Sequence, residues 1–337
     1  MNILFDISHP AHFHLFKNVI NKLSSNHHSI MVTAREKDVL IDLLTRDYFH
    51  FHSLSKRHNG HIGLFIELVL RNVKMLNLCR AFKPDLLVGT SVNVAHIGKI
   101  IKKPTLIVNE DDDAVVPAFS YLAYPFATNI LNPNCLLFSK WRRKRILHNS
   151  YHELAYLHPA NFLPDESILE KYSLEAGKYV VARFSALIAH HDYGAKGLSS
   201  DLWSEIIKVL RDYEIVTSAE NDCTRVILPW DMHHVLAFAK LVISDSQTMT
   251  AEAAVLGVPS IRCSSFVGRL SYLEELEQRY RLTFGFRPDQ SVDMINKIIE
   301  LINNDNLYLH WMEKRNIMLS EKSNFSDFIY DLITTYN

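Results

Sequence analysis

Short apolar runs alternate with longer segments of helical period along most of this 337-residue sequence. That alternation is the pattern of a parallel β-sheet whose strands are joined by crossover helices. The clearest predicted helix is Gly63–Phe82, whose apolar residues recur near the 3.6-residue period at Leu64, Leu68, Val69, Val73, Leu76 and Leu78. In the first half of the chain the predicted strands are Ile3–Ile7, Ser29–Thr33, Phe49–Leu54, Asp85–Gly89 and Thr105–Asn109.

The pattern pauses after about Tyr151 in a proline-punctuated stretch, Leu157–Asp165, which suits a connection between domains. It then restarts, and from about Asp289 onward three helical segments follow without a strand. We therefore predict an α/β fold of two doubly wound domains, residues 1–155 and 156–337, with a C-terminal helical tail that can pack back on the first domain. In the second domain the predicted strands are Tyr179–Arg183, Glu214–Thr217, Val226–Leu228, Leu241–Ser244 and Ser260–Arg262, and the predicted helices include Asp201–Arg211 and Met249–Leu256.

Composition and charge exclude several classes of protein. The formal net charge is −1, so no global field draws the chain to nucleic acid. The four cysteines show no CxxC pair and no metal-ligand spacing, which favours buried, inert thiols in a reducing cytoplasm. The N-terminus lacks the basic segment of a signal peptide, and no window approaches the length of a membrane span. We expect a cytoplasmic protein that does not cross a bilayer.

The segment Ser244–Arg262 is the most informative for chemistry. It leads from a strand through a small polar turn into a helix that ends at Gly257. Unpaired amides at the start of such a helix favour phosphate, and the hydroxyl groups of Ser246 and Thr248 add donors. Glu252, about one turn in, can accept hydrogen bonds from ribose hydroxyls. The alternative is an ordinary capping arrangement of the same residues.

The run from Ser246 to Pro259 resembles the donor-site motif of GT-B glycosyltransferases and hydrolysing UDP-N-acetylglucosamine 2-epimerases, particularly the lipid-linked N-acetylglucosaminyltransferase of peptidoglycan synthesis. With the opening Asp6–His14 and the central Arg183–Asp192, nearly the whole chain resembles an uncharacterised bacterial and archaeal family of GT-B-like architecture. The resemblance implies two Rossmann-like domains facing a cleft, the first for the acceptor and the base, the second for the donor. It also implies a donor site in which the backbone amides of Thr248 and Met249 meet phosphate and Glu252 meets the ribose, and Gln247 is a further candidate for donor binding.

Histidines follow the first predicted strand, where many GT-B proteins have a Gly-rich loop. A neutral imidazole can act as a general base, so we predict that His12 is the base, with Asp6 orienting it. His9 is a second catalytic candidate and His14 a candidate for acceptor binding. The alternatives are helix capping or packing, and a metal site, although the spacing matches no common zinc pattern.

Two further constellations are predicted at the cleft. The loop His190–Ser199 carries His191 and Lys196, which with Arg183 can offset the charge of a departing pyrophosphate; the alternative is that its His-Asp pair stabilises a turn. The acidic run Asn109–Asp113 supplies Glu110 and Asp112 as candidates for binding a sugar hydroxyl. A divalent-cation site and a solvated, capping turn are the alternatives there. We expect no cofactor.

The basic run Lys140–Arg145 follows an aromatic stretch and suits contact with anionic lipid headgroups, the alternative being a solvated helix face. The leading hypothesis is an enzyme that transfers a sugar from a nucleotide, in particular UDP, to a sugar or lipid-linked acceptor in surface-polysaccharide or glycolipid synthesis. The alternatives are a nucleotide-sugar 2-epimerase or hydrolase of the same fold, and a nucleotide-binding module without turnover. The sequence does not indicate an oligomeric state.

Overall fold

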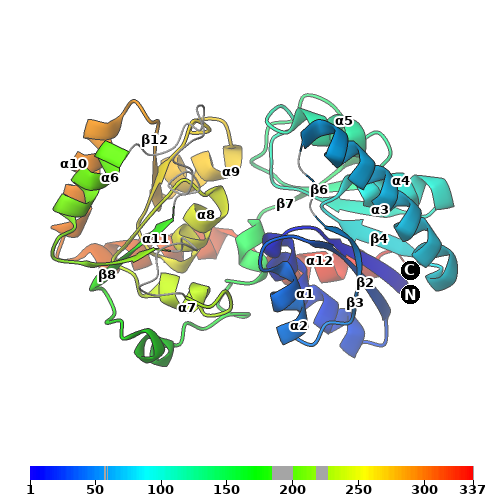
Figure 1. Ribbon diagram of the computed structural model, residues 1–337, viewed down its shortest axis with the longest axis horizontal. Coiled ribbons are helices and arrows are strands. Elements are labelled where there is room, and N and C mark those ends of the chain that lie inside the picture. Colours follow the sequence, from blue (N-terminus) through cyan, green and yellow to red (C-terminus); the bar gives the residue numbers. More distant parts are fainter. Residues whose placement is uncertain (57, 59, 184–199, 218–226, 337) are drawn as a thin grey trace. The chain divides into compact units, whose positions relative to one another are not determined.

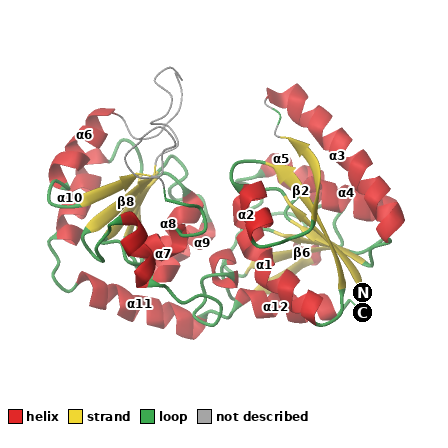
Figure 2. Ribbon diagram, turned by 60° about the horizontal axis from the view of Figure 1, so that its bottom comes forward, coloured by secondary structure: helices red, strands yellow, loops and turns green. Residues whose placement is uncertain are grey.

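The computed structural model describes the chain except for residues 57, 59, 184–199, 218–226 and 337, and it divides into two compact units. Unit 1 comprises Met1–Tyr156 together with Ser323–Asn337, and unit 2 comprises Leu157–Lys322. Each unit is a parallel sheet covered by helices (Figures 1 and 2). The final helix of the chain belongs to unit 1, so unit 1 is built from both ends of the sequence.

The described part of unit 1 contains a seven-stranded sheet in the order β3-β2-β1-β4-β5-β6-β7, with every neighbouring pair parallel. β1 lies inside the sheet and is buried almost throughout, as expected for a strand covered on both faces. Two strands, β6 and β7, were not predicted. The strands are β1 (Asn2–Ile7), β2 (Ser29–Glu36), β3 (Phe51–Lys56), β4 (Leu86–Gly89), β5 (Thr105–Val108), β6 (Asn129–Pro133) and β7 (Arg145–His148).

Helices cover both faces of this sheet (Figure 2). The chain winds from β1 toward one edge and then from β4 toward the other, so right-handed crossovers put the later helices on the opposite face. α1 packs against α2 and α12, whereas α3 packs against α4, and α4 against α5. The helices are α1 (Pro10–Ser25), α2 (Leu40–Arg46), α3 (Gly60–Phe82), α4 (Val92–Ile101), α5 (Pro117–Ala123) and α12 (Phe325–Thr334), with short 3₁₀ helices η1 (Arg142–Lys144) and η2 (His152–Ala155).

Helix α3 faces the sheet with charged residues. Glu67 and Arg71 are 3% and 4% exposed. Glu67 accepts two hydrogen bonds of 2.6 Å from Arg35 on β2, and Arg71 is ion-paired with Asp6 on β1 at 2.8 Å. Three of the apolar positions that indicated the helix, Leu64, Val69 and Val73, are exposed. The inward face carries the paired charges in the first half of the helix and buried Met75 and Cys79 in the second half.

The described part of unit 2 contains a five-stranded parallel sheet in the order β12-β11-β10-β8-β9. Of the predicted strand Val226–Leu228, Ile227 and Leu228 lie in an irregular segment, and Val226 is outside the described residues. β12 was not predicted. The strands are β8 (Tyr179–Arg183), β9 (Glu214–Thr217), β10 (Leu241–Ser244), β11 (Ser260–Cys263) and β12 (Thr283–Phe286).

The helices of unit 2 include four that were expected from the sequence, α6, α8, α10 and α11. α8 packs against α7 and against the neighbouring strands β10 and β11. The helices are η3 (Glu166–Tyr172), α6 (Ser200–Val209), α7 (Met232–Ala237), α8 (Gln247–Leu256), α9 (Ser271–Glu274), the π-helical η4 (Glu275–Arg279), α10 (Ser291–Ile302) and α11 (Leu307–Glu321).

Each sheet has one point at which the winding direction reverses. In unit 1 it lies between β1 and β4, and in unit 2 between β8 and β10. Ligands of open α/β sheets bind outside the carboxyl ends of the strands at this reversal. The residues to consider are therefore those that follow β1 and β4 in unit 1, and those that follow β8 and β10 in unit 2.

The cysteines largely follow expectation. Cys79 and Cys263 are buried free thiols, and burial raises their pKa to about 12 and about 11. Cys135 is a free thiol that is only half-buried, and Cys223 lies outside the described residues. In the part of the chain that the structure describes, no helix is long and apolar enough to cross a membrane.

Candidate functional site

The turn after β1 leads directly into α1. His9 caps this helix, because its Nδ1 accepts a hydrogen bond of 3.2 Å from the amide of Ala11. Pro10 occupies the first helical position, where its missing N–H removes no helical hydrogen bond. The capping alternative is thus confirmed for His9. The cap starts α1 close to the carboxyl end of β1.

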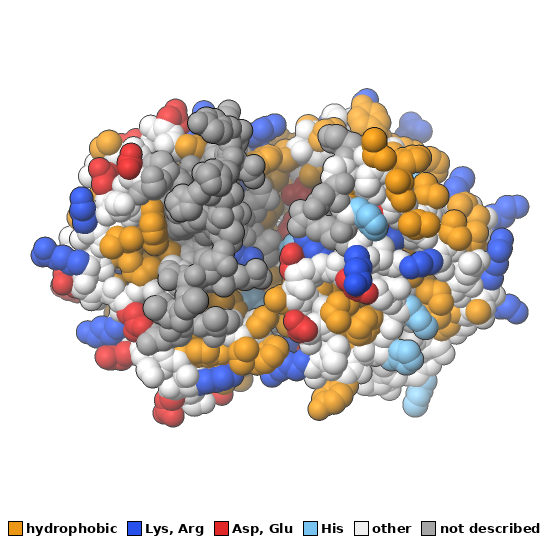
Figure 3. Space-filling model, in the orientation of Figure 1, with side chains coloured by type: hydrophobic (Ala, Val, Ile, Leu, Met, Phe, Trp, Pro, Cys, Tyr) orange, Lys and Arg blue, Asp and Glu red, His pale blue; other side chains and the backbone are white. Residues whose placement is uncertain are grey.

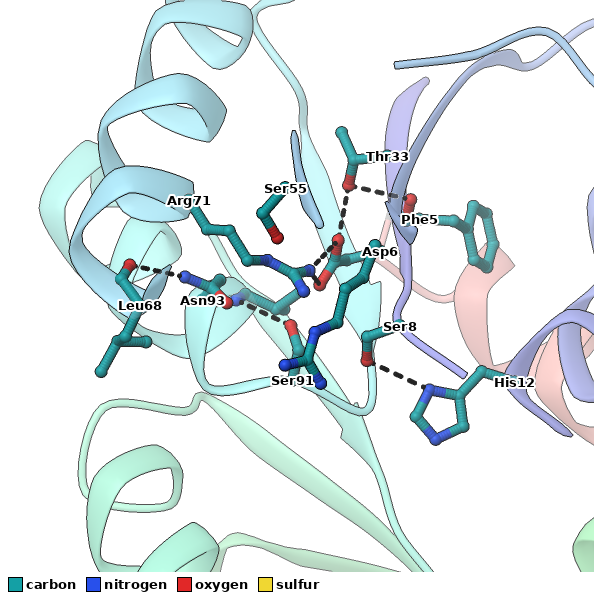
Figure 4. Close-up of polar contacts among 12 residues, drawn as sticks. Phe5, Asp6, Ser8, His12, Thr33, Ser55, Leu68, Arg71, Ser91 and Asn93 are labelled. Carbon is teal, nitrogen blue, oxygen red and sulfur yellow. Dashed lines mark hydrogen bonds and ion pairs between the residues drawn. The ribbon is translucent and has the colours of Figure 1, made fainter. Parts of the chain in front are cut away.

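His12 lies one turn into α1 and is half-buried (Figure 4). Its Nδ1 lies 3.4 Å from the hydroxyl oxygen of Ser8, and its ring centroid lies 5.8 Å from that of His9. Burial, followed by electrostatic interactions with the His9 and His152 rings and with the cations Lys37 and Arg71, holds the pKa of His12 well below its usual value of 6.5. The imidazole is therefore neutral at pH 7 and able to accept a proton.

Asp6 does not orient His12. It is fully buried, and it accepts hydrogen bonds from Thr33 Oγ1 at 2.8 Å and from Arg71 Nη2 at 2.8 and 3.0 Å (Figure 4). The sequence placed Asp6 next to the histidines, but its side chain points across the sheet to α3. Asp6 therefore connects β1, β2 and α3, and it is a structural residue and not a catalytic one.

His152, on η2, was not singled out from the sequence, although it lies beside His12. Its ring stacks on Phe325 of α12 at 5.4 Å, and its Nδ1 lies 3.5 Å from a carboxylate oxygen of Glu110. Burial lowers the pKa of His152 to about 3, so the ring is neutral. Glu110 follows β5 and is only 17% exposed. The expected candidate Glu110 thus lies together with His152 at this edge of unit 1.

A stability change with pH is expected from His152. An unfolded histidine binds a proton below about pH 6.5, whereas folded His152 does so only near its pKa of about 3. Because the unfolded chain binds more protons between these values, the free energy of unfolding falls as the pH falls, by about 2 kcal/mol from this group between pH 6.5 and 5. Urea unfolding at both pH values measures it. His152→Phe keeps the stacking and should flatten the slope; an unchanged slope would contradict the assignment.

In the acidic run after β5, the carboxylates of Asp112 and Asp113 are held by hydrogen bonds from a neighbouring loop. Asp112 Oδ1 accepts a hydrogen bond of 2.6 Å from the amide of Leu137. The carboxylate of Asp113 accepts hydrogen bonds from three donors, the amides of Ser139 and Lys140 and the hydroxyl group of Ser139. These two carboxylates are buried rather than solvated, and they anchor the loop before β7. Asp111, which was not proposed, has its pKa raised to about 6 by burial and by the neighbouring Asp112.

His14 faces a different group from His12. Its ring lies 5.2 Å from that of Tyr156, the last residue of the first segment of unit 1. It is half-buried beside Phe13. An acceptor role for His14 remains a prediction.

In unit 2 the start of α8 has the form expected of an anion site. Ser246 caps the helix, because its hydroxyl oxygen accepts a hydrogen bond of 3.3 Å from the amide of Met249. Gln247 and Thr248 are half-buried, and no described residue offers an acceptor to their amides. Two donors and the positive end of the helix dipole therefore remain for an anion beyond the carboxyl end of β10.

Glu252 is paired within the protein. It is 7% exposed, and its Oε1 lies 3.0 Å from Nε2 of His233 on α7. His233 was not singled out from the sequence, in which 19 residues separate it from Glu252. Glu252 does not complete a capping box with Ser246, because its carboxylate contacts His233 and so connects α8 to α7. The contact with His233 holds the carboxylate of Glu252 in a fixed direction.

The remaining candidates for donor binding differ in exposure, and two of them lie outside the described residues. Arg183, at the end of β8, is exposed, and its carbonyl accepts hydrogen bonds from Ser244 Oγ at 2.9 Å and the amide of Asp245 at 3.2 Å. Met249 was expected to meet phosphate through its amide, but that amide donates to the hydroxyl oxygen of Ser246 at 3.3 Å, and the Met249 side chain is buried. His191 and Lys196 lie outside the described residues.

Comparison with solved structures identifies the fold. A UDP-GlcNAc 2-epimerase from Methanocaldococcus jannaschii matches with a TM-score of 0.67 at 12% identity, covering 100% of both chains. The Neisseria meningitidis UDP-GlcNAc 2-epimerase bound to UDP-GlcNAc matches at 0.65 and 12%, covering 99% of this chain and 100% of that one. The spinosyn rhamnosyltransferase SpnG complexed with thymidine diphosphate matches at 0.66 and 12%, covering 98% and 100%. No curated protein sequence matches.

The predicted architecture is confirmed: this is a protein of the GT-B fold, the fold of glycosyltransferases and UDP-GlcNAc 2-epimerases, with two parallel-sheet α/β domains and a C-terminal helical tail. The chain belongs to the family described as "Protein of unknown function (DUF354)", whose model matches residues 1–336. Among the residues that the structure describes, no group of three His, Cys, Asp or Glu side chains could hold a metal ion.

Proposed function

We propose that this protein is a glycosyltransferase that transfers a sugar from a nucleotide, in particular UDP, to an acceptor hydroxyl. The observation that carries the proposal is the start of α8, where a Ser246 cap leaves the amides of Gln247 and Thr248 open beyond the end of β10. Amides at a helix N-terminus suit a pyrophosphate. Neighbours of the same fold bind UDP-GlcNAc and thymidine diphosphate, which supports a nucleoside diphosphate as the ligand class.

In this proposal unit 2 binds the donor. The amides of Gln247 and Thr248 bind the pyrophosphate, and Arg183 offsets its charge as it leaves. His191 and Lys196 remain predicted contributors. Glu252, held by His233, accepts hydrogen bonds from the ribose hydroxyls. The helix dipole and these donors stabilise the departing UDP, so no metal ion is required by the scheme.

Unit 1 supplies the base. Neutral His12 takes the proton of the acceptor hydroxyl as its oxygen bonds to the anomeric carbon. The bond between that carbon and the phosphate oxygen breaks, and its electron pair stays on UDP. Glu110 and His14 are proposed to bind the acceptor, a sugar or lipid-linked sugar of cytoplasmic polysaccharide or glycolipid synthesis.

A second candidate is a UDP-sugar 2-epimerase or hydrolase. The observation that favours it is the number of acid–base groups at one edge of unit 1. Neutral His12 lies there, and Asp111, with its pKa near 6, exchanges a proton near neutral pH. Removal and return of a proton at carbon requires two such groups with separate pKa values. Turnover of UDP-GlcNAc alone, followed by proton NMR in deuterated water, distinguishes the two reactions.

Glu252→Ala tests the donor site. Loss of a charge-assisted hydrogen bond to ribose removes about 1.5–3 kcal/mol, so the affinity for UDP is expected to fall about tenfold to a hundredfold. Calorimetric titration with UDP measures it, and circular dichroism checks that the variant is folded. Glu313→Ala, an exposed change on α11, is the matched control and should bind as the parent does. Equal affinity in a folded Glu252→Ala protein would refute the ribose assignment.

A further inference from the structure

Helix α3 carries an apolar face that points to solvent. Its first turns expose hydrophobic side chains at the spacing of one helical face, and these define the α3 apolar face. Phe65 is 66% exposed and Ile62 is 78% exposed. Figure 3 shows hydrophobic side chains gathered over this helix at the upper right, with Lys and Arg side chains beside them. The face consists of Ile62, Phe65, Ile66, Val69, Leu70 and Val73.

This exposure is not accounted for by packing within unit 1. A surface helix of a globular protein normally turns its apolar side inward. The inward side of α3 buries Met75 and Cys79 in the second half of the helix. In the first half, beneath the apolar face, that side is occupied by Glu67 and Arg71, which are paired with Arg35 and Asp6. Buried ion pairs contribute little net stability compared with apolar contacts. The sequence therefore keeps its apolar side chains outward at some cost, and contiguous exposed patches of this kind mark interaction sites.

The charge around the apolar face is strongly positive. Residues 60–104, which include α3 and α4, contain seven Lys and Arg against two Asp and Glu, while the whole chain has a net charge of −1. The two acidic residues are already paired, Glu67 with Arg35 and Asp85 with Lys103 at 3.3 Å. Along α3 the apolar face continues into exposed Arg80, whereas the ammonium group of Lys74 donates to the Leu54 carbonyl at 2.8 Å. An apolar helical face followed by cations is typical of helices that lie in a membrane interface.

α3, α4 and α5 pack side by side as one helical layer, and α4 and α5 also expose apolar and cationic side chains. His96 on α4 joins the helices, because it lies within hydrogen-bond distance of Asn72 on α3, at 3.2 Å, and of the Leu122 carbonyl, at 2.9 Å. Leu122 and Phe126 are exposed on this layer, and so is Lys99. Residues 114–152 contain five Lys and Arg and no Asp or Glu.

The basic run that was expected to bind lipid plays a smaller part. Lys144 donates to three carbonyls, of Tyr124, Pro125 and Ala127, at 2.8–2.9 Å, and Arg145 lies over the Phe138 ring at 4.2 Å. Both cations are engaged inside unit 1. Any lipid contact by this layer must therefore depend mainly on α3 and the exposed cations next to it.

We propose that the α3 apolar face docks on an anionic lipid surface, with its hydrophobic side chains in the interface and Arg80 and Lys99 over the headgroups. The positive charge beside the α3 apolar face favours an anionic bilayer over a second copy of this chain as the partner. A second copy of the chain meeting this face about a twofold axis would bring two cationic layers together, which is repulsive. An anionic bilayer offers both a complementary charge and an apolar layer. The proposal holds whether or not the protein transfers a sugar.

The test is sedimentation of the full chain with vesicles. The parent protein is expected to bind vesicles of equal parts phosphatidylcholine and phosphatidylglycerol, and to bind phosphatidylcholine alone at least about tenfold more weakly, with added salt weakening the former. Phe65→Glu combined with Leu70→Glu should lower binding by about tenfold or more. Both side chains are exposed, so the fold is unaffected, and circular dichroism checks it.

Matched changes on unit 2 serve as controls. Val292→Glu combined with Leu309→Glu alters two equally exposed apolar residues and should leave vesicle binding unchanged. The proposal is overturned if the parent protein ignores anionic vesicles, or if the α3 variant binds them as the parent does. Light scattering supplies a further check: a dimer that dissociates in the α3 variant would assign the face to a second copy instead.

Discussion

The His12→Ala variant is expected to lose turnover of the UDP-sugar by about two to four orders of magnitude, the usual contribution of a positioned general base. Its affinity for UDP should be unchanged, because the proposed nucleotide contacts all come from unit 2. Turnover is measured as release of UDP from the sugar nucleotide in the presence of acceptor. His310→Ala, an exposed histidine on α11, is the matched control and should keep full activity.

The pH profile gives an independent reading of the same residue. Since burial holds the pKa of His12 well below 6.5, the base stays deprotonated under mildly acidic conditions. The acid limb of kcat is therefore expected below pH 6.5 and should disappear in the residual activity of His12→Ala. Ser8→Ala, which removes the hydroxyl 3.4 Å from Nδ1, should cost much less. Full activity in a folded His12→Ala protein would eliminate His12 as the base.

The Asp6→Ala variant is expected to lose about 3–5 kcal/mol of stability, because it leaves the buried guanidinium of Arg71 without its counter-ion. Hydrogen-exchange mass spectrometry of the β1 and α3 peptides measures this loss within unit 1, independently of unit 2.

A double variant provides the control for that experiment. Asp6→Leu combined with Arg71→Met replaces the ion pair with apolar side chains and should recover most of the loss. If Asp6→Ala is as stable as the parent protein, the pair does not hold α3 on the sheet. If the double variant is as unstable as the single one, loss of the hydrogen bond to Thr33 matters more than the unpaired charge.

Where local pattern and tertiary environment agree, the sequence predicted the fold closely. β8, β9 and β10 have the predicted bounds, because each is a short apolar run between clear helical segments. β7 was missed because it begins at Arg145, which was assigned to a basic surface run. β12 was missed because it is only four residues long and contains Gly285, which weakens the strand pattern. The bounds of α3 were nearly right, but periodicity alone could not reveal that paired charges would occupy its inner face.

The candidate site was predictable to the same degree. The position of the helix after β10 and its Ser246 cap follow from local sequence. The partners of Asp6 and Glu252 do not, since Arg71 and His233 are brought to them by the winding of the chain. His152 carried no signal of its own. Its neutral state arises from burial beside α12, which the sequence places far away.

The two-part construction of unit 1 affects how the chain is made. Unit 2 is one continuous segment and has its whole sequence once Lys322 has been synthesised. Unit 1 begins first but still lacks α12, the helix that packs on α1 and covers His152. Domains usually fold in the order in which they leave the ribosome. Here the unit that starts first is completed after the other one, so until α12 has been synthesised the nascent unit 1 leaves the surface that receives Phe325 uncovered.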